Sequence, residues 1–186
     1  MSVTQQKKSR TNMLLVLAAF ALPVVLAKLA LTQHWFSYGV TNKGTLVESE
    51  LTLTKLGIAQ EDFEKTWLIL YALPKQCDEQ CEQTLLSVHN TYVALGKEKP
   101  RVKHVALVQG TLSDKQRSRL EQKQWTIVAT TTQALNQLQK PQVLIVDSLG
   151  NVVLSHQPPA DVNSQAMFGK EILADLKKLL KYSRIG

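Results

Sequence analysis

The chain has 186 residues, of which 44% are hydrophobic and 20% charged, and its formal net charge is +7. This length accommodates one domain of ordinary size with an appendage and excludes two full cores, so a single fold should carry the function. Lys7, Lys8, Arg10 and Lys28 supply four of the seven net charges and leave +3 for residues 32–186. So small an excess, with no stretch dense in basic and aromatic residues, argues against nucleic-acid binding.

An apolar segment near the N-terminus predicts a membrane anchor. Residues 13–31 (MLLVLAAFALPVVLAKLAL) are apolar except for Lys28, and basic residues precede them. A stretch of about 20 such residues spans the hydrocarbon core, and Lys28 lies near one end, where its stem reaches the headgroups. The positive-inside rule leaves residues 1–12 in the cytoplasm. We therefore expect a single-pass protein of a bacterial inner membrane, with everything beyond residue 31 in the periplasm.

A cleaved signal peptide is the alternative to a retained anchor. The uninterrupted apolar run ends at Ala27, Pro23 lies inside it, and residues 25–27 form a mediocre cleavage site. Against cleavage, the interfacial aromatic residues Trp35 and Phe36 extend the span. Both alternatives export the rest of the chain.

Residues 32–64, after the anchor, are predicted to be a connecting region. They carry a turn signal at 41–44 and a short strand around 51–56. The regular pattern starts with residues 66–72 (TWLILYA), a continuous apolar run of strand length that Pro74 ends. Such a run is typical of a central strand covered on both faces. The folded domain is therefore predicted to comprise residues 65–186.

The remaining elements follow in a regular order. Apolar residues at helical spacing and a stop at Gly96 predict a helix over 78–95, and a Ser113 cap opens a polar helix over 113–124. A turn signal at 147–151 joins two strands into a hairpin. The other predicted elements are strands at 102–108, 125–129, 143–146 and 152–154, a short helix at 131–138, and an amphipathic helix at 169–182.

This order of elements predicts an α/β fold. It places a mixed sheet between helices, with right-handed crossovers joining the parallel strands. The arrangement matches the thioredoxin architecture. In that fold the loop after the first core strand meets the residues before the hairpin at one end of the sheet, and Cys77 lies in that loop.

The candidate site is the pair formed by Cys77 and Cys81, the only cysteines. If both lie in the first helical turns they share one face, so two thiolates can converge on Cu(I), or the pair can close a disulfide after slight unwinding. The helix N-terminus lowers the pKa of a thiol there, whereas Asp78, Glu79 and Glu82 oppose that shift. A structural disulfide, common in exported proteins, is the alternative without chemistry.

Several motifs carry a family resemblance. They are Trp67-Leu68-Ile69-Leu70-Tyr71, Pro74, Cys77-x-x-x-Cys81, Leu95-Gly96-Lys97, Arg101-Val102 and residues 143–150 (VLIVDSLG). With them the chain resembles, over residues 65–183, the Sco/SenC family of membrane-tethered, thioredoxin-like proteins that help deliver copper to cytochrome c oxidase. It also looks like the small membrane proteins encoded beside terminal oxidases. The resemblance implies a thioredoxin-like fold, Cu(I) as the ligand, and a respiratory oxidase subunit as the partner.

The chain departs from the family pattern at several positions. The family places prolines after its two cysteines, where this chain has Asp78 and Glu82, and a metal-binding histidine before the hairpin, near the place of Gln139. His156 should pair near Val143 across the hairpin, at the correct end of the sheet but on an edge strand. The candidate metal ligands are therefore Cys77, Cys81 and His156.

Other residues are weaker candidates. His104 lies early on a strand parallel to the first, toward the end of the sheet opposite the cysteines, and is typical of a satisfied core residue. His89 on the helix exterior and His34 beside the membrane are most simply surface residues, and Met167 is a packing or incidental residue. Pro141 is near the place of the thioredoxin cis-proline.

Three functions are compatible with these features. The preferred one is an assembly factor for a respiratory cytochrome oxidase, whose cysteines hold Cu(I) or reduce the cysteines of the oxidase copper site. The second is a non-catalytic interaction module at the oxidase with a structural or vestigial cysteine pair. The third is a general thiol–disulfide oxidoreductase, which the Cys-x-x-x-Cys spacing and the neighbouring carboxylates disfavour.

Overall fold

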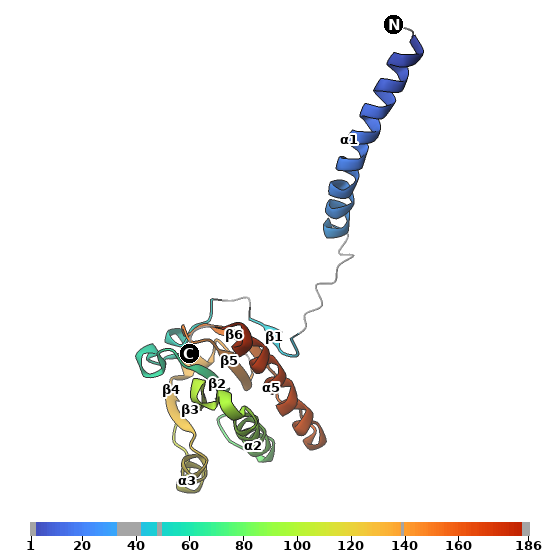
Figure 1. The fold of residues 1–186 in the computed structure, drawn as a ribbon. Coiled ribbons are helices and arrows are strands. Elements are labelled where there is room, and N and C mark those ends of the chain that lie inside the picture. Colours follow the sequence, from blue (N-terminus) through green and yellow to red (C-terminus); the bar gives the residue numbers. More distant parts are fainter. Residues whose placement is uncertain (1–2, 33–41, 48–49, 139, 184–186) are drawn as a thin grey trace. The chain divides into compact units, whose positions relative to one another are not determined.

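The computed structural model describes residues 3–32, 42–47, 50–138 and 140–183. The chain divides into two compact units, Met1–Thr41 and Asn42–Gly186. The first unit contains helix α1 (Val3–Thr32), which includes Pro23 and the whole segment predicted to be an anchor (Figure 1). Every side chain described in α1 is exposed. Within the described residues, no helix meets the length and apolarity required of a membrane span.

The second unit is built on a six-stranded mixed sheet with strand order β1-β6-β5-β2-β3-β4. The strands are β1 (Thr45–Leu46), β2 (Trp67–Ala72), β3 (Val102–Gln109), β4 (Thr126–Thr130), β5 (Gln142–Val146) and β6 (Val152–His156). β2 pairs parallel with β3, and β3 with β4, whereas β5 runs antiparallel to both β2 and β6. This topology confirms the predicted mixed α/β, thioredoxin-like fold and the predicted hairpin.

β2 occupies the centre of this sheet, and all six of its residues are buried. Since successive side chains of a strand point to opposite faces, β2 contributes to two separate cores. Trp67, Ile69 and Tyr71 belong to one core, whereas Leu68 and Leu70 belong to the other. The continuous apolar run of β2 is therefore explained by cover on both faces, as the sequence predicts.

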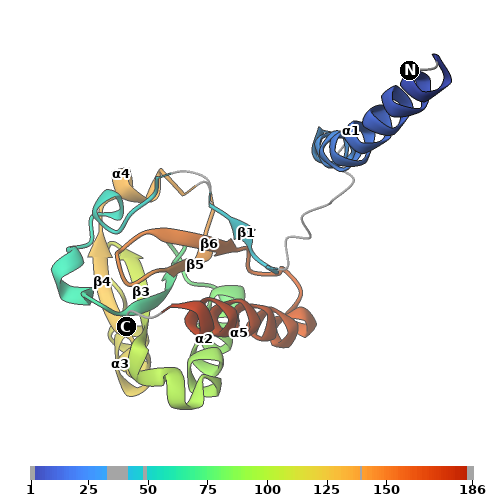
Figure 2. The same ribbon diagram turned by 45° about the horizontal axis from the view of Figure 1, so that its top comes forward.

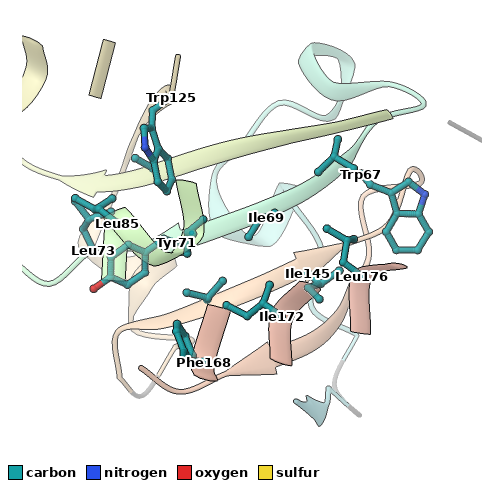
Figure 3. Packing of buried hydrophobic residues seen from close by; sticks show 14 of the residues in the cluster. Trp67, Ile69, Tyr71, Leu73, Leu85, Trp125, Ile145, Phe168, Ile172 and Leu176 are labelled. Atoms are coloured by element: carbon teal, nitrogen blue, oxygen red, sulfur yellow. The ribbon is translucent and has the colours of Figure 1, made fainter. Parts of the chain in front are cut away.

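Helices cover the first face of the sheet. α2 (Glu79–Ala94), α3 (Asp114–Gln122) and α5 (Gln165–Tyr182) each contribute buried side chains to the core that Figure 3 shows. In α5 these residues recur at helical spacing, which is the amphipathic pattern seen in the sequence: Phe168, Ile172, Leu176 and Leu180. α2 and α5 lie side by side on this face (Figure 2).

An irregular segment covers the second face, together with the short helix α4 (Thr132–Leu135). This segment contains the 3-10 turns η1 (Thr54–Leu56) and η2 (Gln60–Phe63), and its buried residues are Leu51, Leu53, Leu56, Ile58 and Phe63. The predicted strand at 51–56 is replaced by η1, and only Thr52 forms an isolated bridge, with Asn151. Residues 42–64 therefore belong to the compact unit and help to cover the second face of the sheet. Two further 3-10 turns are η3 (Gly96–Arg101) and η4 (Val162–Ser164).

His104 on β3 is buried within an aromatic cluster. Its Nε2 lies 3.0 Å from the Lys123 carbonyl oxygen, and its ring stacks on Tyr92 with centroids 4.2 Å apart. Trp125 packs against the same ring at 4.6 Å. Burial lowers the pKa of His104 to about 4, an effect that the bond to Lys123 opposes and that His89 and Lys99 reinforce. This confirms the predicted satisfied core histidine.

We expect the burial of His104 to make stability depend on pH. Because its folded pKa of about 4 lies below the ordinary value of 6.5, the stabilisation is complete above pH 6.5 and is lost as the pH falls toward 4. The loss is at most about 1.4 kcal/mol for each pH unit. Urea unfolding at several pH values should give a shallower acid loss for His104→Phe than for the native chain. Parallel pH profiles for the two proteins would contradict the assignment.

Candidate redox site

Cys77 and Cys81 form a disulfide at the N-terminal end of α2. Cys77 lies in the loop that follows β2, Cys81 lies in the first turn of the helix, and their Cα atoms are 5.1 Å apart. The sequence correctly placed this pair at the start of the helix after the first core strand. Of the two states that it left open, a metal-binding dithiol and a disulfide, the disulfide is the one present.

Asp78 begins the helix between the two cysteines. As the N-cap residue it accepts a hydrogen bond from the backbone N–H of Cys81, at 2.9 Å from Oδ1. An N-cap carboxylate of this kind stabilises a helix by about 1 kcal/mol. Sequence reasoning treated Asp78 only as a charge that repels a thiolate and missed the cap. Its signal was an aspartate directly before the first helical residue, which is a common N-cap position.

The two sulfur positions differ in exposure. Cys81 is 1% exposed, whereas Cys77 is only half-buried. Each cysteine lines a different hollow: Cys77 lines one of about 330 Å³ between α2 and α3, and Cys81 lines one of about 350 Å³ beside Pro141. A reagent in solution therefore reaches the disulfide at Cys77.

Tyr71 is the next-to-last residue of β2. Its side chain lines the same hollow as Cys81. Burial raises the pKa of its hydroxyl to about 12, a hydrogen bond with Thr84 lowers it, and the Asp78 charge raises it further. The phenol is therefore neutral at physiological pH and adds no further negative charge beside Asp78.

His156 lies opposite Val143, in the register that the sequence predicts. It is not on an edge strand, however, because β1 adds a further strand beyond β6. Its ring is buried, and Nε2 lies 3.4 Å from Asp175 Oδ2 without a hydrogen bond among the described residues. Burial lowers the pKa of His156, and the nearby charges of Asp175 and Glu171 oppose that shift.

Asp175 on α5 ties this histidine to the start of the folded unit. Its carboxylate accepts hydrogen bonds from the backbone N–H groups of Lys43, at 2.8 and 3.0 Å, and Gly44, at 2.8 Å. A Cβ atom at Gly44 would lie 2.5 Å from His156 Nε2, so this close approach requires glycine. The sequence did not reveal this network, because the Asp175 carboxylate accepts its hydrogen bonds from backbone N–H groups that lie more than a hundred residues earlier in the chain.

The remaining candidate ligands are spread apart. Among the residues that the structure describes, no group of three or more His, Cys, Asp or Glu side chains is placed to hold a metal ion. His89 is half-buried beside His104 and not a free surface residue, with their ring centroids 5.5 Å apart. Met167 is 58% exposed. Gln139, His34, Trp35 and Phe36 lie outside the described residues.

Pro141 was expected near the place of the thioredoxin cis-proline. The described part of the chain contains no cis peptide bond, so Pro141 is preceded by a trans bond. It lines the hollow on the Cys81 side of the disulfide, together with Pro74 and Pro158. The structure therefore places Pro141 beside the disulfide, and its preceding bond, whose isomer the sequence left open, is trans.

Solved structures similar to this one come from several sources. The thioredoxin domain of a thiol-disulfide oxidoreductase from Bacteroides vulgatus is 13% identical, with a TM-score of 0.48 over 64% of this chain and 82% of that chain. Copper-bound ScoI of Arabidopsis thaliana is 10% identical, with a TM-score of 0.48 over 64% and 89%. Copper-bound ScoI of Bradyrhizobium japonicum is 10% identical, with a TM-score of 0.43 over 62% and 92%. Such low identities do not assign the chain to the Sco family, so that resemblance stays a prediction.

Comparison with curated proteins finds no match. A family match, by contrast, covers residues 67–183, from the first residue of β2 to just beyond the last residue of α5. That range contains the disulfide, both hollows and most of the sheet. The chain therefore belongs to the family described as transmembrane-like, thioredoxin-like, C-terminal domain.

Proposed function

We propose that this chain exchanges its Cys77–Cys81 disulfide with cysteines of a client protein. The observation that carries the proposal is the asymmetry of the pair, since Cys77 is half-buried and Cys81 is 1% exposed. A disulfide with one accessible sulfur is attacked at that sulfur, and the shielded one leaves as a thiolate. The leaving sulfur lies in the first turn of α2, where the helix dipole stabilises a negative charge.

The exchange is balanced in two steps. A client thiolate attacks Cys77 Sγ, the Cys77–Cys81 bond breaks, and Cys81 takes the electron pair. A second client thiolate then attacks the client sulfur of the mixed disulfide and releases Cys77 as a thiolate. The client is oxidised to a disulfide, the chain is reduced to a dithiol, and the two thiolates take protons from water. In reverse, the reduced chain reduces a client disulfide.

The preferred client is a subunit of a respiratory cytochrome oxidase, reached from the outer face of a bacterial inner membrane. The Sco/SenC-like motifs of the sequence support this client. An anchor function of α1 is supported by its exposed apolar side chains, such as Phe20 at 77% and Val24 at 68%, and by the transmembrane-like description of the family. Apolar side chains of this size gain about 1.5–3 kcal/mol each on transfer out of water.

The anchor predicts a specific fractionation. The full chain should remain with the membranes after washing at high salt and alkaline pH, because burial in lipid does not depend on charge pairs. A variant in which a cleavable signal peptide replaces residues 1–31 should move to the soluble periplasmic fraction, because the domain is then exported without its anchor. Release of the full chain by these washes would exclude the anchor.

The exchange predicts opposite behaviour of two cysteine variants. Cys81→Ser should accumulate a mixed disulfide with a single-cysteine peptide that is added in excess as its symmetrical disulfide, because neither the chain nor the bound peptide then has a second thiol to resolve the bond to Cys77. Cys77→Ser should react slower by about tenfold or more, since its remaining thiol is buried. Both rates are measured by mass spectrometry of acid-quenched samples. Equal, slow reaction of both variants would favour the non-catalytic module with a structural disulfide.

A second candidate function is Cu(I) binding by the reduced pair. It is favoured by the closeness of the two cysteines where the loop enters α2, with Cα atoms 5.1 Å apart, because Cu(I) prefers sulfur ligands. Bound Cu(I) would be cargo for delivery to the oxidase and would offset the repulsion between the thiolates and Asp78. His156, the predicted third ligand, lies beside Asp175 in the structure.

Competition with a chromophoric chelator tests this candidate on the full, reduced chain. One tightly held equivalent of Cu(I) should disappear in the Cys77→Ala, Cys81→Ala double variant. His156→Ala distinguishes the ligand sets, because a site made by two thiolates keeps its affinity and a site that includes His156 loses at least about tenfold. Absence of any tight equivalent would eliminate copper and leave the exchange reaction.

A further inference from the structure

A hollow of about 330 Å³ lies between α2 and α3, directly beside the disulfide. Cys77 lines it, and its apolar lining consists of Leu73, Leu85, Leu86, Leu112, Leu120 and Trp125. Figure 3 shows Trp125, Leu85 and Leu73 gathered at one end of the sheet. The volume is at the lower end of the range of about 300–1,000 Å³ found for ligand pockets. It therefore suits a large apolar side chain with its adjoining backbone.

Trp125 is the aromatic residue in the lining of this hollow. The residue is 5% exposed, and its indole Nε1 has no hydrogen-bond partner among the described residues. A buried donor without an acceptor costs about 1–3 kcal/mol. The nitrogen itself has almost no accessible surface, so Trp125 contributes apolar ring surface to the hollow and not a donor.

The charged residues of the hollow favour an acidic occupant. Arg119 and Lys123 line it from α3 and the residue that follows this helix, whereas Glu82 is the one lining carboxylate among the described residues. Glu82 Oε2 lies 3.5 Å from Arg119 Nη1, so this pair links the two helices across the hollow. The lining therefore keeps one net positive charge, which a carboxylate of the occupant would balance.

We propose that this hollow recognises the client segment next to the client's cysteine, by taking an apolar side chain followed by an acidic residue. The inference rests on the proposed exchange reaction and names the sequence that the exchange would prefer. Cys77 is the residue that the hollow and the disulfide share, so a client sulfur bonded to Cys77 brings its neighbouring residue to the opening. The hollow beside Pro141 borders Cys81 instead, whose sulfur is shielded.

The test measures which peptides react with Cys77 in the full chain carrying Cys81→Ser. Peptides containing Cys-Leu-Glu, Cys-Ala-Glu or Cys-Leu-Lys carry their thiol as a mixed disulfide with 2-nitro-5-thiobenzoate. Attack by the Cys77 thiolate forms the protein–peptide disulfide and releases the coloured aromatic thiolate. The same mixed disulfide of 2-mercaptoethanol, which has no side chain to bind, reports exchange at Cys77 alone.

Two tryptophan substitutions on this background separate the hollow from the cysteine. Gln83→Trp fills the hollow from α2, and Gln133→Trp is a matched change at an exposed position on α4 outside it. Leu86→Ala is a milder variant, because Leu86 lines the hollow while being 40% exposed. It removes apolar lining without opening the core.

The Leu-Glu peptide should react about tenfold faster than the Ala-Glu peptide, as expected for one apolar side chain in a pocket. Gln83→Trp should abolish this ratio, Leu86→Ala should reduce it, and Gln133→Trp should keep it. The Leu-Lys peptide should react about threefold slower than Leu-Glu at low salt, and this difference should shrink at high salt.

Equal rates for the Leu and Ala peptides, or a ratio that survives Gln83→Trp, would overturn the recognition role of the hollow. Equal rates for Leu-Glu and Leu-Lys would overturn the charge match. In both cases normal reaction of the 2-mercaptoethanol derivative leaves the exchange function standing. Failure of that derivative to react would overturn the exchange itself and this inference with it.

Discussion

The position of β2 is the constraint on which the rest of this structure depends. It lies at the centre of the sheet between β3 and β5, with all six residues buried, so both of its faces must be covered. α2 and α5 cover one face and residues 51–63 cover the other. Because β2 is held on every side, the loop that leaves it has a fixed origin. That loop carries Cys77, and the helix that it enters carries Cys81.

Asp78 makes helix formation and sulfur chemistry compete at this point. Its carboxylate accepts a hydrogen bond from the backbone N–H of Cys81 and so caps the start of α2. The helix therefore begins between the two cysteines that form the disulfide. The same negative charge repels a neighbouring thiolate. The disulfide is neutral, so it does not experience this repulsion. In the reduced state the repulsion returns, and two events relieve it: renewed disulfide formation, or binding of a cation by both sulfurs. The cap therefore favours the oxidised pair while leaving a reason for a soft metal ion to bind the reduced one.

The predictable parts of this fold are those in which one local pattern determines the structure. The apolar run at 67–72, the helical spacing of α2 and the turn between β5 and β6 were each visible in the sequence and are present. Residues 51–63 were not recognised as core, because Leu51, Leu53, Leu56 and Ile58 follow neither a helical nor a strand period. β1 is too short to give a pattern at all. Its pairing with β6 is what removes His156 from the sheet edge.

His156 shows why a correct register does not determine the chemistry of a side chain. Its pairing opposite Val143 follows from the hairpin and could be read from the sequence. Its neighbour Asp175 comes from α5, and the donors to that carboxylate come from Lys43 and Gly44, more than a hundred residues earlier. Moving the histidine toward the cysteines would separate its ring from the Asp175 carboxylate and would open space beside Gly44. The structural tie therefore competes with any role of His156 as a ligand, and it leaves the two sulfurs as the groups of the site that are free to react.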